Sequence, residues 1–273
     1  MSAGCASPRV TAILLDAGGV MIFPSPGLLL PPLRAVGVQP TVADLERAHY
    51  RAMAECDEPG REPPGGQWWL EYLRDFVAAC GVAPADVDAV AEDIVGLTDG
   101  FSWTHVGRDV AEALRGIAAL GLPLGIVSNS TGEVEQTLRQ LDVCYAFNGG
   151  GDAGAGAVGG EAGPAGGEAG PAGGEAGPAR RGIEVGAVID SAVVGVSKPD
   201  PAIFALALDA LGMPAVDRRT VVHVGDSLRY DVTGAIAAGV RPVHLDPHGY
   251  CPAPDGHEHI RRLDEIVILA ATG

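Results

Sequence analysis

Apolar positions along the 273-residue chain follow two different spacings. The run RVTAILL at residues 9–15 is β-branched and continuously apolar, which predicts a buried strand ending at Asp16. The segments that begin near residues 41, 67 and 85 place apolar side chains three and four positions apart, as amphipathic helices do. Because no strand-like run interrupts residues 40–98, we expect a helical subdomain there.

From about residue 105, apolar runs alternate with helical patterns of ten or so residues. The expected strands are LPLGIVSNS, EVGAVID, TVVHVGDS and RPVHLD, with a helical pattern between each pair. Such alternation predicts an α/β fold, in which a parallel sheet is covered by helices on both faces. We assign residues 1–24 and 105–273 to this core and residues 25–104 to the inserted helical subdomain.

Residues 149–182 have a different composition. The heptapeptide GGEAGPA occurs three times in tandem, beginning at residues 159, 166 and 173. Glycine, alanine and proline at this density cannot bury a hydrophobic core. We therefore expect a flexible surface insertion within the core.

Composition restricts the location and the partners. The formal net charge of −17 disfavours nucleic acid and anionic membranes as partners, since both require a basic surface. The five cysteines are scattered and odd in number, which is typical of reduced thiols. No apolar run reaches membrane-spanning length, so we expect a soluble cytoplasmic protein. The sequence does not define an oligomeric state.

Polar residues follow the predicted strands at their carboxyl ends, where open parallel sheets bind ligands. Lys198 is the only lysine of the chain, although the sequence holds 18 basic residues, and this isolation suggests a local chemical role for its ammonium group. The candidate residues at this edge are Asp16, Ser128, Asn129, Lys198, Asp226, Ser227 and Asp231.

This set of side chains predicts a site for a phosphoryl group and a hard cation. Two adjacent carboxylates repel each other unless a divalent ion lies between them, and Mg²⁺ binds through carboxylate, phosphate and water oxygens. A carboxylate can attack phosphorus and form an acyl phosphate. The ammonium and hydroxyl groups would then stabilise charge on the phosphoryl oxygens.

Four segments, ILLDAGGV, IVSNS, VSKPDPAIF and HVGDSLRYDVTGAIAAG, resemble in order and spacing the motifs of the haloacid dehalogenase-like (HAD) hydrolase superfamily. The resemblance covers nearly the whole core and implies a Rossmann-like, three-layer sheet with residues 25–104 as a small helical cap. It implies that Asp16 is the nucleophile, that Ser128, Asn129 and Lys198 bind phosphate, and that Asp16, Gly18, Asp226 and Asp231 hold Mg²⁺.

The first motif departs from the family pattern at Gly18. Phosphatases of the superfamily usually carry an aspartate at this position, which protonates the leaving group and then activates water. Glycine retains the main-chain carbonyl that the family's metal uses, but it lacks the acid. General acid–base catalysis typically contributes about 10²–10⁴-fold to a rate.

Three hypotheses remain open. The first is a Mg²⁺-dependent phosphatase that acts on a small phosphorylated metabolite through an aspartyl-phosphate at Asp16, with protons from water, from the substrate or from a cap residue such as His49. Nothing in the sequence singles out His49, and the sequence favours a partly buried cap histidine without a catalytic role. The second is another reaction of the superfamily, such as dehalogenation, which needs no metal and is disfavoured by Asp226. The third is a non-catalytic regulator that binds a phospholigand.

Two further features have plain structural interpretations. We expect the Trp68–Trp69 pair to belong to the core of the helical subdomain. The segment HGYCPAPDGHEH offers His248, Cys251, His257 and His259 as zinc ligands, but their spacing matches no structural zinc pattern. We expect this segment to be a surface loop.

Overall fold

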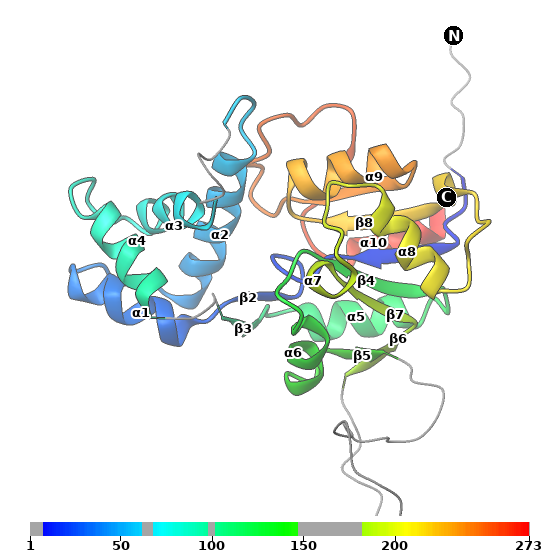
Figure 1. Cartoon of the computed structure of the whole chain (residues 1–273), viewed down its shortest axis with the longest axis horizontal. Helices are drawn as coiled ribbons and strands as arrows, with labels where there is room; N and C mark the ends of the chain where they lie inside the picture. Colours follow the sequence, from blue (N-terminus) through cyan, green and yellow to red (C-terminus); the bar gives the residue numbers. More distant parts are fainter. Residues whose placement is uncertain (1–7, 62–67, 98–101, 147–181, 273) are drawn as a thin grey trace, which may run out of the picture.

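The computed structural model of the chain describes residues 8–61, 68–97, 102–146 and 182–272 (Figure 1). The GGEAGPA insertion predicted over residues 149–182 lies, apart from Gly182, outside the described residues. The elements are β1 (Ala12–Leu15), β2 (Ile22–Pro24), α1 (Pro26–Ala35), α2 (Val42–Cys56), α3 (Trp68–Ala79), α4 (Val87–Gly96), β3 (Trp103–Val106), α5 (Val110–Ala118), β4 (Leu124–Ser128), α6 (Val134–Gln140), β5 (Cys144–Ala146), β6 (Ile183–Val185), β7 (Ala187–Asp190), α7 (Ser191–Val194), α8 (Ala202–Ala210), η2 (Arg218–Thr220), β8 (Val221–Gly225), η3 (Leu228–Val232), α9 (Thr233–Ala238), β9 (Arg241–Leu245), β10 (Glu258–Ile260) and α10 (Glu265–Thr272).

The central sheet is parallel and six-stranded, with the strand order β10-β9-β8-β1-β4-β7. Strand β1 lies in the middle, between β8 and β4. The α/β fold class predicted from the alternating pattern is therefore confirmed. A separate two-stranded parallel sheet pairs β5 with β6.

Successive residues of β1 enter two different hydrophobic clusters. Ile13 and Leu15 pack with buried residues of α5, α6 and α10, whereas Ala12 and Leu14 pack with those of α8 and α9. All four side chains are buried, because side chains alternate between the two faces of a strand and helices cover both faces. The core thus has the predicted three layers.

Helices α1 to α4 form a unit with its own apolar cluster beside the sheet, coloured blue to cyan in Figure 1. Helix α2 begins at a capping box, in which Thr41 and Asp44 exchange hydrogen bonds. No helix in the described part of the chain is both long and apolar enough to cross a membrane.

Helix α1 was not expected from the sequence. It contains Pro31 and Pro32, which remove backbone donors and normally interrupt a helix. The helix nevertheless forms, with Leu29 and Leu33 completely buried in the cluster of the helical unit. Burial of its apolar face outweighs the local preference.

Strands β2 and β3 connect the helical unit to the core and pair with each other as an antiparallel ribbon. Neither strand was predicted, because each is only three or four residues long. The ribbon includes Trp103 and Val106, so it crosses the predicted boundary between residues 104 and 105. The domain boundaries themselves remain predictions.

The segment from His248 to His259 is not simply a surface loop, as the sequence suggested. It ends in strand β10, where His259 pairs with His244 of β9 in the parallel register. Cys251, His257 and His259 are half-buried. The correction has a physical reason: β10 completes the edge of the sheet, and a three-residue strand leaves little periodicity in the sequence.

Candidate active site

The predicted site residues meet at the carboxyl edge of the central sheet. Asp16 follows β1, Ser128 ends β4, and Asp226 follows β8. They share one cavity of about 980 Å³, whose lining includes every residue predicted for the site: Asp16, Gly18, Ser128, Asn129, Lys198, Asp226, Ser227 and Asp231. The strand ends therefore bring together groups that lie more than a hundred residues apart in the sequence.

Lys198 places its ammonium group between two carboxylates. Its Nζ atom lies 2.9 Å from Oδ2 of Asp16 and 2.7 Å from Oδ1 of Asp231. Burial disfavours the charge of Lys198, but these two carboxylates outweigh it and raise the pKa of the ammonium group. The lysine is therefore held in its charged form at the centre of the site.

Asn129 positions this lysine through its backbone. Its Oδ1 atom accepts the N–H of Lys198 at 2.8 Å, and its Nδ2 donates to the carbonyl of Lys198 at 2.9 Å. Both ends of the amide are thereby engaged with the lysine. The family resemblance implies that Asn129 binds phosphate, which stays a prediction; its observed contacts hold the Lys198 segment against the end of β4.

Three carboxylates converge beside the ammonium group. Asp16, Asp226 and Asp231 offer oxygen atoms that all lie within 4.8 Å of one another. Fully ionised, they would carry two negative charges more than Lys198 neutralises, which matches a divalent cation. Oxygen donors of this kind suit Mg²⁺, so the described residues fit the cation that the sequence predicted.

The carboxylates differ in their protonation. Burial opposes the ionisation of Asp231, but Lys198 and His223 outweigh it and hold the pKa of Asp231 well below its usual range. Burial, together with the neighbouring Asp231 and Asp226, raises the pKa of Asp16 to about 7 although Lys198 opposes this shift. In the absence of a metal, Asp16 therefore binds a proton more readily than Asp231.

Asp231 is fixed on several sides. His223 of β8 donates from Nε2 to Oδ1 at 2.8 Å, and the N–H of Ser227 donates to Oδ2 at 3.1 Å. Gly225 allows this close packing, because a Cβ atom at that position would lie 2.0 Å from Cγ of Asp231. A larger residue in place of Gly225 in the HVGDS segment would therefore displace the Asp231 carboxylate.

Asp226 contacts a histidine of the helical unit. His49 of α2 donates from Nε2 to Oδ2 of Asp226 at 2.7 Å, and its Nδ1 lies 2.8 Å from the hydroxyl of Tyr72. Gly19, with φ +67°, allows this approach, because its Cβ would lie 2.2 Å from Oδ2 of Asp226. His49 is 1 % exposed and uses both ring nitrogens. It therefore packs against a predicted metal ligand and is not free to protonate a leaving group.

Asp57 makes a second contact between the helical unit and the core. It follows α2 and accepts hydrogen bonds from the hydroxyl of Ser227 at 3.0 Å and from the backbone N–H groups of Leu228 and Arg229. Burial raises the pKa of Asp57 to about 6, although these donors oppose the shift. The end of α2 is thereby held against the loop that carries Asp226.

The wall of the cavity above Gly18 is aromatic. A Cβ atom on Gly18 would lie 3.3 Å from Cζ3 of Trp103, so the indole lies where a side chain at this position would enter. Trp69 lies 6.3 Å from Trp103 between ring centroids and also lines the cavity. With 36 % of its surface exposed, Trp69 is not the core residue that the sequence suggested. The Trp68 side chain lies outside the described residues.

Sequence reasoning named His49 and the tryptophan pair but not Trp103, Tyr72 or Asp57. No local pattern could identify them, because each contact joins residues that are distant in the chain. The hydrogen bond between His49 and Asp226 spans 177 positions. Only the spacing of apolar residues placed His49 on a helix, and that spacing does not reveal what the helix faces.

Comparisons with known proteins agree with this geometry. A family model described as "haloacid dehalogenase-like hydrolase" matches residues 172–239, which include Lys198, Asp226 and Asp231. Haloacid dehalogenase-like hydrolase domain-containing protein 3 of Danio rerio is 29 % identical over 175 residues, covering 64 % of this chain and 55 % of that protein. The chain thus spans about half the length of the curated relatives it matches.

A phosphoserine phosphatase of Thermus thermophilus is 44 % identical over 59 residues, which cover 22 % of each protein. Among solved structures, the putative HAD-hydrolase YfnB of Bacillus subtilis bound to magnesium has a TM-score of 0.54. It is 15 % identical in sequence, with 96 % of this chain and 99 % of that chain covered. This likeness concerns the fold. Motifs, fold and relatives agree, and over the matched segments the chain is similar to haloacid dehalogenase-like hydrolases.

Proposed function

We propose that the protein is a Mg²⁺-dependent phosphatase that hydrolyses a small phosphorylated metabolite through an aspartyl-phosphate at Asp16. One observation carries the proposal: Asp16, Asp226 and Asp231 converge around a single buried ammonium group, that of Lys198. This arrangement has the charge and the oxygen donors for one divalent cation and one phosphoryl group. The phosphatase similarity of a short segment points in the same direction.

Each residue has a role that follows from its place. A carboxylate oxygen of Asp16 attacks phosphorus, and the bond between phosphorus and the leaving oxygen breaks. Water then attacks the phosphorus of the aspartyl-phosphate, which releases phosphate and restores Asp16. Lys198 and the Ser128 hydroxyl stabilise the phosphoryl oxygens, while Asp16, Asp226, Asp231 and the Gly18 carbonyl hold Mg²⁺. The cation, when bound, neutralises phosphoryl charge.

The remainder of the cavity describes the kind of substrate. The polar residues lie at the carboxyl edge of the sheet, whereas the helical unit and the ribbon contribute apolar and aromatic side chains. These are Ile22, Met53, Trp69, Tyr72, Leu73, Val95 and Trp103. Apolar walls with a few convergent polar groups are typical of small-molecule sites. A substrate would place its phosphoryl group against Asp16 and its organic part against the aromatic wall.

A screen of phosphate esters with the purified chain tests the proposal. We expect phosphate release that requires Mg²⁺, is removed by EDTA and is lost in Asp16→Asn, whose side chain is no longer a nucleophile. Glu46→Gln, a substitution outside the cavity of the site, is the matched control and should leave the rate unchanged. Activity that persists in Asp16→Asn or without any divalent ion would overturn the proposal.

Non-catalytic phospholigand binding is the second candidate, and one observation favours it. Trp103 lies against Gly18, where phosphatases of the superfamily carry their acid, so the site has its binding groups without this catalytic group. The same screen separates the two functions. Mg²⁺-dependent binding of vanadate or phosphate without turnover of any ester would favour a regulator. Release of halide from 2-haloacids without metal would instead indicate dehalogenation.

A further inference from the structure

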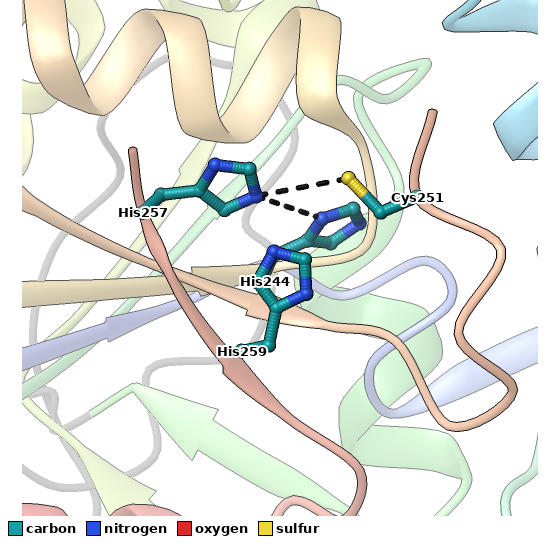
Figure 2. A group of neighbouring side chains, drawn as sticks. All are labelled: His244, Cys251, His257 and His259. Carbon is teal, nitrogen blue, oxygen red and sulfur yellow. Dashed lines mark hydrogen bonds between the residues drawn. The ribbon is translucent and has the colours of Figure 1, made fainter. Parts of the chain in front are cut away.

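Four side chains with metal-binding atoms gather beside strands β9 and β10, next to the peptide of Asp226 but separate from the carboxylates of the three aspartates. They are His244, Cys251, His257 and His259, and one ligand atom from each lies within 4.8 Å of the others (Figure 2). His244 and His259 are register partners on neighbouring strands, so their side chains leave the same face of the sheet. Cys251 and His257 come from the loop that joins the two strands.

The distances suit one small cation. Nε2 of His257 lies 3.3 Å from Nδ1 of His244 and 3.8 Å from Sγ of Cys251. Tetrahedral Zn²⁺ holds nitrogen and sulfur at about 2.0–2.3 Å, which separates its ligand atoms by about 3.3–3.7 Å. The nitrogen of His257 points at both neighbours, as Figure 2 shows. Because all four ligand atoms lie within 4.8 Å of one another, side-chain shifts of up to about 1 Å would bring them onto one cation.

His244 uses Nε2 for a contact outside the cluster, which leaves Nδ1 available as a ligand atom. Its Nε2 lies 3.1 Å from the carbonyl oxygen of Asp226, which can only accept a hydrogen bond. An N–H of the ring therefore lies on Nε2, and Nδ1 faces Nε2 of His257. A metal-binding histidine that donates its other N–H to a backbone carbonyl is a recurrent arrangement in metal sites.

The other two histidines are also prepared to act as ligands. Nε2 of His259 is buried and has no hydrogen-bond partner among the described residues, while its Nδ1 lies 3.9 Å from a carboxylate oxygen of Asp246. Nε2 of His257 faces Nδ1 of His244 at 3.3 Å, so its ring is turned into the cluster.

Asp246 fixes the loop that carries the thiol. It accepts the backbone N–H of Tyr250 at 2.9 Å and that of Cys251 at 3.2 Å. Its negative charge would also offset the net positive charge of a Zn²⁺ ion bound by three neutral imidazoles and one thiolate. His248, which the sequence grouped with these residues, instead packs against Tyr50 and Tyr250.

We propose that His244, Cys251, His257 and His259 bind one Zn²⁺ ion in a tetrahedral structural site. Three imidazoles and one thiolate are donors of borderline softness, which suits Zn²⁺ and is foreign to Mg²⁺. All four positions are filled by protein atoms, so the site stabilises structure and is not itself hydrolytic. It would tie the loop after β9 to β10 and, through His244, to the peptide of Asp226.

Metal analysis of the 273-residue chain tests this assignment. After EDTA treatment and dialysis we expect the chain to bind one equivalent of Zn²⁺ that excess Mg²⁺ does not displace. Substitution with Co²⁺ should give tetrahedral d–d absorption and a thiolate-to-cobalt charge-transfer band. This spectrum is recorded on the cobalt-loaded protein without any mutation, so it does not depend on the folding of a variant. Absence of the thiolate band would overturn the assignment.

Variants then identify the ligands. Cys251→Ser and His257→Gln should each weaken Zn²⁺ binding by at least about tenfold and, for Cys251→Ser, remove the charge-transfer band. The matched controls are Cys80→Ser, another half-buried thiol, and His248→Gln, a histidine near the same loop. Asp16→Asn should keep the zinc equivalent, which separates this site from the aspartates. Unchanged binding in both ligand variants would contradict the proposal, as would equal loss in the controls.

Discussion

The indole ring of Trp103 lies against Gly18, 3.3 Å from the position that a Cβ atom would take there. Glycine at this position is therefore matched by a large residue opposite it. A side chain added at Gly18 would require the indole to shift by a few tenths of an ångström. Introducing an acid at Gly18 therefore also requires a change at Trp103.

We predict that Gly18→Asp alone gives little increase in phosphatase rate, because the new carboxyl group meets the indole. Gly18→Asp combined with Trp103→Val should raise kcat/KM by about 10²-fold or more, within the range that general acid–base catalysis contributes. The measurement is steady-state hydrolysis of one phosphate ester. Trp103→Val alone is the control and should not show this gain. An equal gain from Gly18→Asp alone would mean that the indole moves aside freely.

The rate should depend steeply on the leaving group. Without a side-chain acid at Gly18, and with both nitrogens of His49 engaged, the leaving oxygen departs largely as the anion. Across aryl phosphates, we predict a fall of several-fold in kcat/KM for each unit by which the pKa of the released phenol rises. The double variant that restores the acid should flatten this dependence. A flat series in the natural sequence would reveal a proton donor elsewhere.

Binding of Mg²⁺ should strengthen as the pH rises toward about 7. The raised pKa of Asp16, about 7 without metal, means that protonation of this group stabilises the metal-free fold. That stabilisation is fully present below about pH 4 and is lost as the pH rises through 7. Because the cation needs the carboxylate, its affinity should fall by up to about tenfold per pH unit below 7.

The rise in melting temperature with Mg²⁺, measured from pH 5.5 to 8.5, checks this linkage. Asp16→Asn has no carboxyl group that titrates. Its melting temperature should therefore rise less with Mg²⁺, and the rise should be nearly independent of pH over this range. Equal Mg²⁺ stabilisation of the unsubstituted chain at pH 5.5 and pH 8.5 would contradict the assignment of Asp16 to the cation site.

Gly225→Ala should destabilise the fold and disturb the site together. Its methyl group would lie 2.0 Å from Cγ of Asp231, and the carboxylate is held there by His223 and Lys198. We predict a loss of about 3 kcal/mol in the free energy of unfolding, measured by urea denaturation. Gly116→Ala on α5 is the matched control, because its Cβ meets Val267 only at 3.4 Å. Similar losses in both variants would argue against a specific contact at Asp231.

The positions of the site residues could be predicted because each follows a recognisable strand. A buried apolar run that ends in a polar residue marks the carboxyl end of a parallel strand, and those ends meet at one edge. This reasoning brought Asp16, Ser128 and Asp226 together correctly. It depends only on local pattern and on the topology that alternating strands and helices impose.

Contacts between distant segments could not be predicted in the same way. Helical spacing placed His49 on α2, but the partner on that face, Asp226, depends on how the helical unit packs on the core. The zinc candidates show the same limit: His244 was read as part of a strand, and His248 was grouped with Cys251 in its place. The pairing of β9 with β10 places His244, and not His248, beside Cys251. Neither short strand has a sequence pattern that predicts this pairing.

The chain enters and leaves the helical unit through one element, the ribbon of β2 and β3. Both crossings of the chain lie side by side in that ribbon, and Trp103 is part of it. Replacing the helical unit together with this ribbon would therefore also replace Trp103, the residue opposite Gly18. A different helical unit would therefore suit this core only if its own ribbon placed a side chain opposite Gly18 that leaves room for the glycine backbone.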